Sequence, residues 1–253
     1  FIEGEVFTVT GGMWPRAHKP VEPVGTGFFK TYGAYVDSHE GIDVMYETTA
    51  KEFIVEDGVV TGVIAEGKTG NKVTVKATNG VVLATGGFAG NVEMRQKYNT
   101  QWADLGEQIK TTNASGVTGD GIAMAEKVGA NLIDMGNIQL LPLGDPETGA
   151  LTGNIEHDVE RRIFVNKEGN RFVNEGGRRD EMTQALIAQT DSYMFIVMDS
   201  DCYPTGDEVN NFNESANDLV AAGRAFKADT LEELAEKIGV PAENLVAAVD
   251  GFN

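Results

Sequence analysis

Two glycine-rich turns, each leading into a predicted helix, constrain the fold of this sequence more than any other feature. Residues 81–84 are continuously apolar, as in a strand buried on both faces, and the turn 85–91 follows directly. A second turn, 118–121, opens a helix whose apolar positions recur at helical spacing. Glycine permits positive φ and removes the side chain, and a helix N-terminus adds unpaired N–H groups. Each turn therefore indicates either a ligand-binding edge or a structural strand-to-helix junction.

The hydrophobic periodicity changes along the chain. Residues 26–37 carry aromatic side chains at helical spacing and predict a helix. Residues 43–77 alternate apolar and polar side chains, and the tight turn at Asp57-Gly58 predicts a hairpin within a β-meander. After Asn137, predicted helices alternate with short strands. These patterns predict an α/β chain of mixed α+β character, with a domain boundary near residue 137.

Composition excludes several function classes. The 253 residues hold 20 Lys and Arg against 39 Asp and Glu, and a net charge of −19 argues against a nucleic-acid partner. No apolar run approaches the roughly 18 residues that a membrane span needs. The lone Cys202 excludes an internal disulfide and a cysteine zinc site, and the histidines lack metal-ligand spacing, so no metal is expected. Neither a GxGxxG after a first strand nor a GxxxxGK[S/T] motif is present.

A charged segment holds the richest candidate chemistry. Residues 154–162 mix carboxylates, His157 and arginines, and Arg178-Arg179 follows at an element junction. Such a mixture can relay protons or bind a substrate carboxylate through a planar guanidinium, and it also suits a salt-bridged surface hairpin. A smaller basic cluster, 16–19, suits either an anionic group or a plain surface loop. Residue types alone leave these alternatives open.

The order of the motifs resembles a known family. The series runs Gly11-Gly12 with 16–18, then 83–91, 119–121 with 125–130, 138–142, 165–175 and 179–180. It resembles the flavoprotein subunit of the fumarate reductase/succinate dehydrogenase family, in the soluble single-chain branch that includes flavocytochrome fumarate reductases and urocanate reductase. The resemblance covers nearly the whole chain.

The resemblance implies an architecture and a cofactor. Members bind FAD in a dinucleotide-binding domain and cover it with a capping (clamp) domain, with the active site between the two. We therefore expect residues 1–137 to be part of the FAD-binding domain, with a β-meander, and residues 138–253 to form a mixed α+β capping domain. The family's dinucleotide fingerprint is expected before Phe1 and its closing substrate ligands after Asn253, so that the chain is an internal fragment.

The resemblance also implies residue roles in hydride transfer from flavin N5 to the C=C bond of an unsaturated carboxylate. By motif, Arg179 is the proton donor and Glu156 supplies it with protons. Leu141 and Asp120 are expected at the substrate. The residues expected to approach FAD are Gly11, Gly12, Ala84, Thr85, Gly86, Gly87, Thr118, Gly119 and Asp120.

One position departs from the family pattern and bears on the substrate. Fumarate-specific members carry His where this chain has Leu141, and an aliphatic side chain cannot donate a hydrogen bond to a carboxylate. We therefore rank an unsaturated carboxylate other than fumarate first, then urocanate, then fumarate. Two alternatives stay open: an FAD-dependent dehydrogenase of the ketosteroid type, and an inactive, cofactor-free capping or binding fragment. Expected partners are the small unsaturated acid and an unidentified electron donor, without nucleic acid or membrane span.

Overall fold

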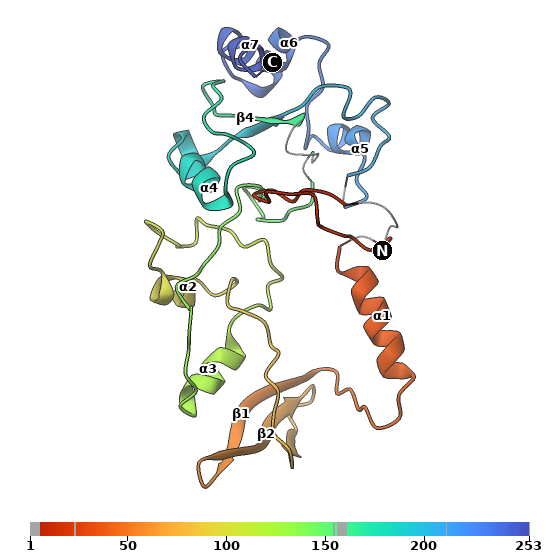
Figure 1. The fold of residues 1–253 in the computed structure, drawn as a ribbon, viewed down its shortest axis with the longest axis vertical. Helices are drawn as coiled ribbons and strands as arrows, with labels where there is room; N and C mark the ends of the chain where they lie inside the picture. Colours follow the sequence, from red (N-terminus) through yellow and green to blue (C-terminus); the bar gives the residue numbers. More distant parts are fainter. Residues whose placement is uncertain (1–5, 23, 154, 156–160, 211, 253) are drawn as a thin grey trace. The chain divides into compact units, whose positions relative to one another are not determined.

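The protein is described by a computed structural model over residues 6–22, 24–153, 155, 161–210 and 212–252. The chain divides into two compact units, one of residues 39–138 and one that combines residues 1–38 with 139–253. Figure 1 shows the order of the elements along the chain. The mixed α/β class predicted from the sequence is confirmed, with small antiparallel sheets. The assignment of residues 1–137 and 138–253 to an FAD-binding and a capping domain stays a prediction.

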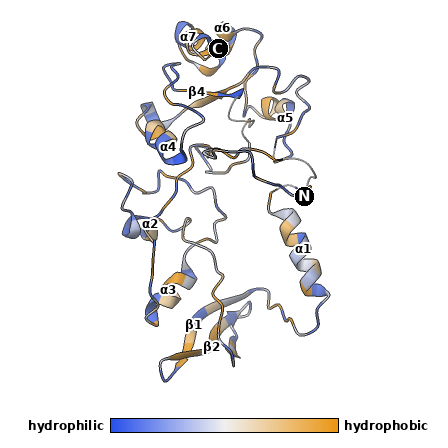
Figure 2. Cartoon of the chain, viewed as in Figure 1, coloured by the Kyte–Doolittle hydropathy of each residue, from blue (hydrophilic) through white to orange (hydrophobic). Residues whose placement is uncertain are grey.

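The unit of residues 39–138 is built on the predicted β-meander. Strands β1 (Thr48–Glu56), β2 (Val59–Gly67) and β3 (Lys72–Lys76) form an antiparallel sheet in that order. Asp57 and Gly58 join β1 to β2 with φ of 51° and 79°, the left-handed pair that a two-residue hairpin turn requires. Hydrophobic residues recur along β1 and β2 (orange in Figure 2). The hairpin is therefore formed where the sequence predicts it.

Two short helices complete this unit. Helix α2 (Val92–Tyr98) is capped by Asn91, whose side chain accepts from Met94 N, and α3 (Asp120–Lys127) contacts β1. The buried Arg95 donates to the carbonyls of Ile109 and Gly106, at 2.8 and 3.3 Å. Burial lowers the pKa of the Arg95 guanidinium, and these carbonyls orient it.

The expectation of a buried strand at residues 81–84 is wrong. This segment forms no strand, and Val82 is 92% exposed. The antiparallel sheet ends at β3, so within the described residues no neighbouring strand pairs with the backbone of 81–84. A continuous apolar run indicates that a segment tends to be buried. A strand also needs a neighbouring strand with which its backbone can form hydrogen bonds.

The other unit begins with helix α1 (Thr26–Asp37), at the bounds that the aromatic spacing predicts. Farther along come β4 (Ile163–Val165), α4 (Arg179–Ile187), the 3-10 turn η2 (Thr190–Ser192) and β5 (Phe195–Val197). Strands β4 and β5 pair antiparallel, Phe164 opposite Ile196. Helices α5 (Ala216–Ala221), α6 (Leu231–Ile238) and α7 (Ala242–Asp250) follow.

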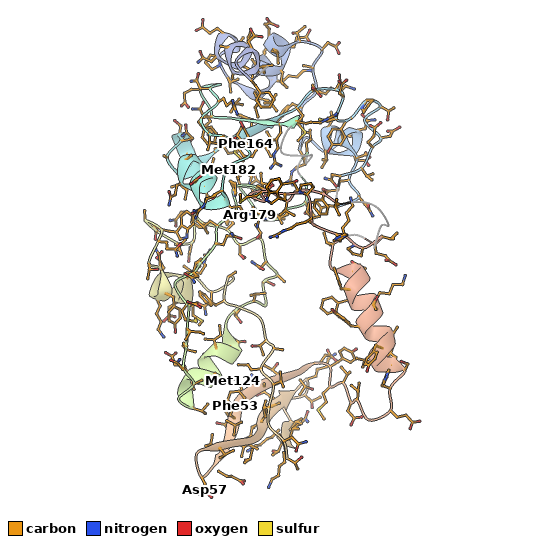
Figure 3. The ribbon with its side chains drawn as sticks, in the orientation of Figure 1. Phe53, Asp57, Met124, Phe164, Arg179 and Met182 are labelled. Carbon is orange, nitrogen blue, oxygen red and sulfur yellow. The ribbon has the colours of Figure 1, made fainter. Side chains whose placement is uncertain are left out.

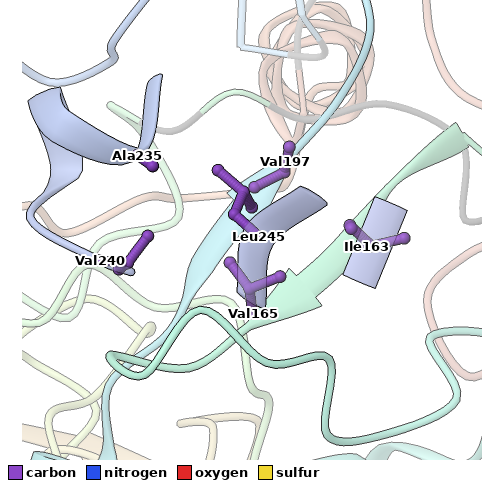
Figure 4. Packing of buried hydrophobic residues seen from close by; sticks show 6 residues of the cluster. All are labelled: Ile163, Val165, Val197, Ala235, Val240 and Leu245. Carbon is purple, nitrogen blue, oxygen red and sulfur yellow. The ribbon is translucent and has the colours of Figure 1, made fainter. Parts of the chain in front are cut away.

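A hydrophobic core joins this small sheet to the last two helices. Figure 4 shows Leu245 of α7 beside Val165 of β4 and Val197 of β5. Leu245 and Val165 are fully buried, and burial of one such side chain contributes about 1.5–3 kcal/mol. Thr230 caps α6, because its side chain accepts a hydrogen bond from Glu233 N. The core holds β4 rigidly, and β4 in turn supports the site described next. The buried residues of this hydrophobic core are Ile163, Val165, Val197, Ala235, Val240 and Leu245.

Candidate functional site

Arg179 is the first residue of α4 and lies at the element junction that the sequence predicts. Its Nε donates to the carbonyl oxygen of Thr10 at 2.5 Å, and its Nη1 donates to Oε1 of Gln139 at 3.2 Å. Figure 3 shows Arg179 at one end of α4, with Met182 one turn along the helix. Two segments remote in the sequence therefore hold one half-buried guanidinium.

The charge of Arg179 is not neutralised by an ion pair with any described residue. Both of its acceptors are neutral oxygens. Its neighbour Arg178 pairs with Asp180 at 2.7 Å, and Arg171 pairs with Glu175 at 2.6 Å. The hydrogen bonds to these carboxylates raise the pKa of both guanidiniums. Arg179 thus presents a positive charge, held in place by neutral groups, that can attract an anionic ligand.

Gly11 packs directly against Arg179. Gly11 adopts a φ of 77°, and a Cβ at this position would lie 2.6 Å from Cγ of Arg179. Gly12 closes the same turn by donating from its N–H to the carbonyl of Val9 at 2.7 Å. Only glycine combines this backbone conformation with this approach. The contact of Gly11 and Gly12 with FAD stays a prediction.

Thr10 connects Arg179 to a second, fully buried arginine that sequence reasoning did not single out. Nη2 of Arg162 donates to Oγ1 of Thr10 at 2.8 Å, and Arg162 is 1% exposed. Its guanidinium lies 5.2 Å from the ring centroid of Phe164, a cation–π arrangement. The charged segment that contains Arg162 was visible in the sequence. No local signal marked Thr10 beyond the two glycines after it.

The remaining site predictions in this unit have different outcomes. Leu141 is half-buried and lies two residues after Gln139, which binds Arg179. Its role at the substrate stays a prediction. Glu156 lies outside the described residues, so its predicted proton-supply role rests on the resemblance alone.

In the unit of residues 39–138, the two glycine turns come together. Gly90 N donates to the carbonyl of Val117 at 2.8 Å, and the Asn91 amide donates to the carbonyl of Thr118 at 2.9 Å. Gly119 precedes α3 with a φ of 81°, and a Cβ there would lie 2.9 Å from Cβ of Phe88. These contacts join residues 88–91 to residues 117–119, next to the predicted cofactor residues 84–87 and 118–120.

The first of these turns is open to a ligand. Residues 84–87 are exposed, and among the described residues the N–H groups of 85–87 have no hydrogen-bond acceptor. Gly86 has a φ of 77°, and no atom lies within 4 Å of a Cβ built on it. At the start of α3, Oγ1 of Thr118 donates to the exposed Asp120 at 2.8 Å. Free N–H groups beside an open glycine suit a ligand that accepts hydrogen bonds.

Comparison with a protein-family model decides the family. Residues 11–253 match the model described as the FAD binding domain. The chain belongs to this family. FAD is therefore its cofactor. The free N–H groups of 85–87 are chemically suited to the hydrogen-bond acceptors of FAD, and their contact with FAD stays a prediction.

The chain is similar to several characterised flavoproteins. It is 39% identical to an NADH:acrylate oxidoreductase from Vibrio harveyi over 96% of this chain and 24% of the relative. It is 37% identical to a urocanate reductase from Eggerthella lenta over 90% of this chain and 38% of the relative. An open-conformation flavocytochrome c3 fumarate reductase superposes with a TM-score of 0.69 and 26% identity, over 98% of this chain and 42% of that one.

A more distant match bears on the dehydrogenase alternative. A 3-oxosteroid 1-dehydrogenase from Mycobacterium tuberculosis is 32% identical over 84% of this chain and 40% of its own length. Across these matches the chain spans between 24% and 42% of the length of its relatives.

The described residues include neither a candidate membrane span nor a candidate metal cluster. Among them, no helix has the length and hydrophobicity to cross a membrane. No group of three or more His, Cys, Asp or Glu side chains in the same residues is arranged to hold a metal ion.

Proposed function

We propose that this chain is part of an FAD-dependent reductase that saturates the C=C bond of an unsaturated carboxylate. The observation that carries the proposal is the guanidinium of Arg179, held by Thr10 and Gln139 without a counter-ion among the described residues. Relatives named for acrylate, urocanate and fumarate support the same substrate class.

When bound and reduced by the electron donor, FAD would supply a hydride to the carbon β to the carboxylate. The electron pair of the double bond then moves toward the α carbon and the carboxylate. Arg179 stabilises this negative charge, because a cation fixed beside the reacting atoms favours the negative charge that develops during the reaction. A proton from Arg179 completes the addition at the α carbon, and one hydride plus one proton balance the reduced bond.

One nitrogen of Arg179 suits the proton transfer. Nε donates to Thr10 and Nη1 donates to Gln139, whereas Nη2 has no acceptor among the described residues. We assign the donated proton to Nη2 for this reason. A guanidinium holds its proton tightly, so a nearby base must return a proton to it after each transfer. The resemblance gives Glu156 this role.

Leu141 narrows the substrate class. Its side chain cannot donate a hydrogen bond to a second carboxylate, so a fumarate-like dicarboxylate would leave one charged group without that partner. Our ranking is an unsaturated acid other than fumarate, such as acrylate, then urocanate, then fumarate. The relative named for acrylate supports this order.

The test uses the full-length protein that contains this chain, loaded with FAD and reduced by a viologen dye. Turnover of acrylate, urocanate and fumarate is measured with this reductant, and dehydrogenation of a 3-ketosteroid is measured in parallel with an oxidised dye as the electron acceptor. We expect reduction of acrylate or urocanate to exceed that of fumarate. Turnover confined to the steroid would establish the dehydrogenase alternative. Protein that retains no flavin would favour the cofactor-free binding fragment.

Arg179→Ala, compared with Arg178→Ala, tests the catalytic residue. Arg178 is adjacent in sequence but forms an exposed ion pair with Asp180. We expect Arg179→Ala to lower kcat by about 10²- to 10³-fold, the usual loss for a group that stabilises developing charge. Arg178→Ala should change kcat little, and both variants should retain FAD. Near-normal turnover by Arg179→Ala would overturn the assigned role.

A further inference from the structure

Strand β4 supports Arg179 from two directions. Arg162, the residue immediately before β4, donates from Nη2 to Oγ1 of Thr10, and the carbonyl of Thr10 accepts from Nε of Arg179. Within β4, the N–H of Phe164 donates to Oε1 of Glu175 at 2.8 Å. Glu175 is 1% exposed and lies four residues before Arg179. Both the segment that bears Arg179 and the residue that holds its guanidinium are thus tied to one strand.

Arg162 occupies a defined position. Its side chain is 1% exposed, and its guanidinium lies over the ring of Phe164, itself 0% exposed. Removing a charged group from water is costly, so the fold must orient such a group through its contacts. Phe164 also belongs to the strand that packs on the core of α6 and α7. Arg162 is therefore a rigid donor toward Thr10.

Thr10 transmits this position to Arg179. Thr10 is 8% exposed, and its hydroxyl and its carbonyl each accept from a different arginine. A rotation of the Thr10 peptide would break the bond to Nε of Arg179. The next residue, Gly11, already lies against the Arg179 side chain. The orientation of Thr10 therefore sets the direction of the Arg179 guanidinium and of its Nη2.

We infer that Arg162 is a positioning residue, which acts through Thr10 to aim the Arg179 guanidinium at the double bond that is reduced. The inference rests on the proposed function of Arg179. Arg162 itself does not touch the substrate. Displacing a catalytic group by about 1 Å can lower a rate about 100-fold, so removing either bond should slow the chemical step more than it weakens substrate binding.

The experiment removes each end of the Arg162–Thr10 bond in the full-length, FAD-loaded protein. Thr10→Val deletes the hydroxyl but keeps the side-chain shape and the carbonyl, and Arg162→Met deletes the donor. For both we expect kcat with the best unsaturated acid to fall about 10- to 100-fold. The KM and the flavin content should change little. Thr10→Ser, which restores the hydroxyl, should restore kcat.

A matched control distinguishes a loss of kcat caused by a displaced Arg179 from one caused by a less stable fold. Ser215 is 8% exposed, like Thr10, and its hydroxyl accepts from Asp218 N at the start of α5. Ser215→Ala therefore also deletes a buried hydroxyl from the same unit. Its unfolding midpoint should fall about as much as that of Thr10→Val, with kcat unchanged. A kcat for Thr10→Val equal to that of Ser215→Ala would overturn the inference, even where Arg162→Met fails to fold.

A double-mutant cycle tests whether the loss of kcat in Thr10→Val arises through Arg179. If Thr10 acts through Arg179, adding Thr10→Val to Arg179→Ala should cause no further loss of kcat. Losses that multiply would show that Thr10 acts independently and would refute the inference. The two proposals fail in different ways. Normal turnover by Arg179→Ala defeats the proposed function, whereas a defective Arg179→Ala beside a normal Thr10→Val defeats only the role of Arg162.

Discussion

Gly11 and Arg179 approach so closely that a single added methyl group would displace the arginine. A Cβ on Gly11 would lie 2.6 Å from Cγ of Arg179 and 3.1 Å from its backbone nitrogen. The backbone nitrogen cannot move without shifting the first turn of α4 (blue in Figure 2, because it is strongly charged). The two residues are 168 positions apart, so the requirement for glycine arises from tertiary packing.

We predict that Gly11→Ala slows the enzyme by displacing Arg179. The substitution adds backbone strain at a φ of 77° and a clash with Arg179. Gly223→Ala is the control, because Gly223 has a φ of 70° and no atom within 4 Å of a built Cβ. Each should lose about 1 kcal/mol or more of unfolding free energy from strain. Gly11→Ala alone should also lower kcat by about tenfold or more in steady-state assays. Equal kcat values would contradict the proposed geometry.

Gly86→Ala tests whether the open turn contacts FAD. Gly86 has a φ of 77° and free space where the methyl would point, so a ligand close to this backbone would meet the new group. Gly70→Ala, in the β2–β3 turn, matches it with a φ of 78° and equally open space. Titration of the apoprotein, monitored by flavin fluorescence, should show weaker FAD binding for Gly86→Ala than for Gly70→Ala, by about tenfold. Identical affinities would argue that FAD does not approach Gly86.

Leu141→His addresses substrate choice. A histidine can donate a hydrogen bond to a second carboxylate, which leucine cannot. We expect kcat/KM for fumarate to rise about tenfold relative to acrylate, since one such contact contributes about 1.4 kcal/mol of discrimination. Competition assays with both acids in one reaction measure this ratio directly. An unchanged ratio in a folded, FAD-loaded variant would mean that Leu141 does not line the substrate pocket.

Asp145 should make stability depend on pH. Burial alone would raise the pKa of this carboxyl, but hydrogen bonds from Thr148 and Glu147 and the Arg224 guanidinium together lower it. Because the folded pKa lies below the unfolded one, the ionised group stabilises the fold at neutral pH. This contribution is lost as pH falls below about 3.9 and through the folded pKa.

The corresponding variant is Asp145→Asn. In urea unfolding at neutral pH it should lose about 1–3 kcal/mol relative to the parent protein. The difference in stability between the two proteins should shrink as pH falls below about 3.9 and through the lowered folded pKa of the parent carboxyl, where that carboxyl becomes protonated. Glu147→Gln, an exposed charge in the same loop, should leave the pH dependence of the parent nearly unchanged. A constant difference across this pH range would exclude the carboxylate of Asp145 as its source.

Secondary-structure elements that depend on local sequence patterns were predictable from the sequence. Alternating side chains and the Asp57-Gly58 turn specify the β1–β2 hairpin, and the aromatic spacing of α1 specifies its bounds. Arg179 was identified by motif, and the structure places it at the start of α4. In contrast, the apolar run 81–84 indicated a strand, yet strand formation depends on a partner that the local sequence does not describe.

The sequence alone determined the family resemblance, the cofactor and the identity of the candidate arginine, because these depend on residue types in a fixed order. Only the tertiary structure decided what holds that arginine. The bonds from Arg179 and Arg162 to Thr10 span 169 and 152 residues. Sequence periodicity reports contacts within one element, whereas such distant partners meet only after β4 has packed on its core. The environment of Arg179 is therefore a property of the fold.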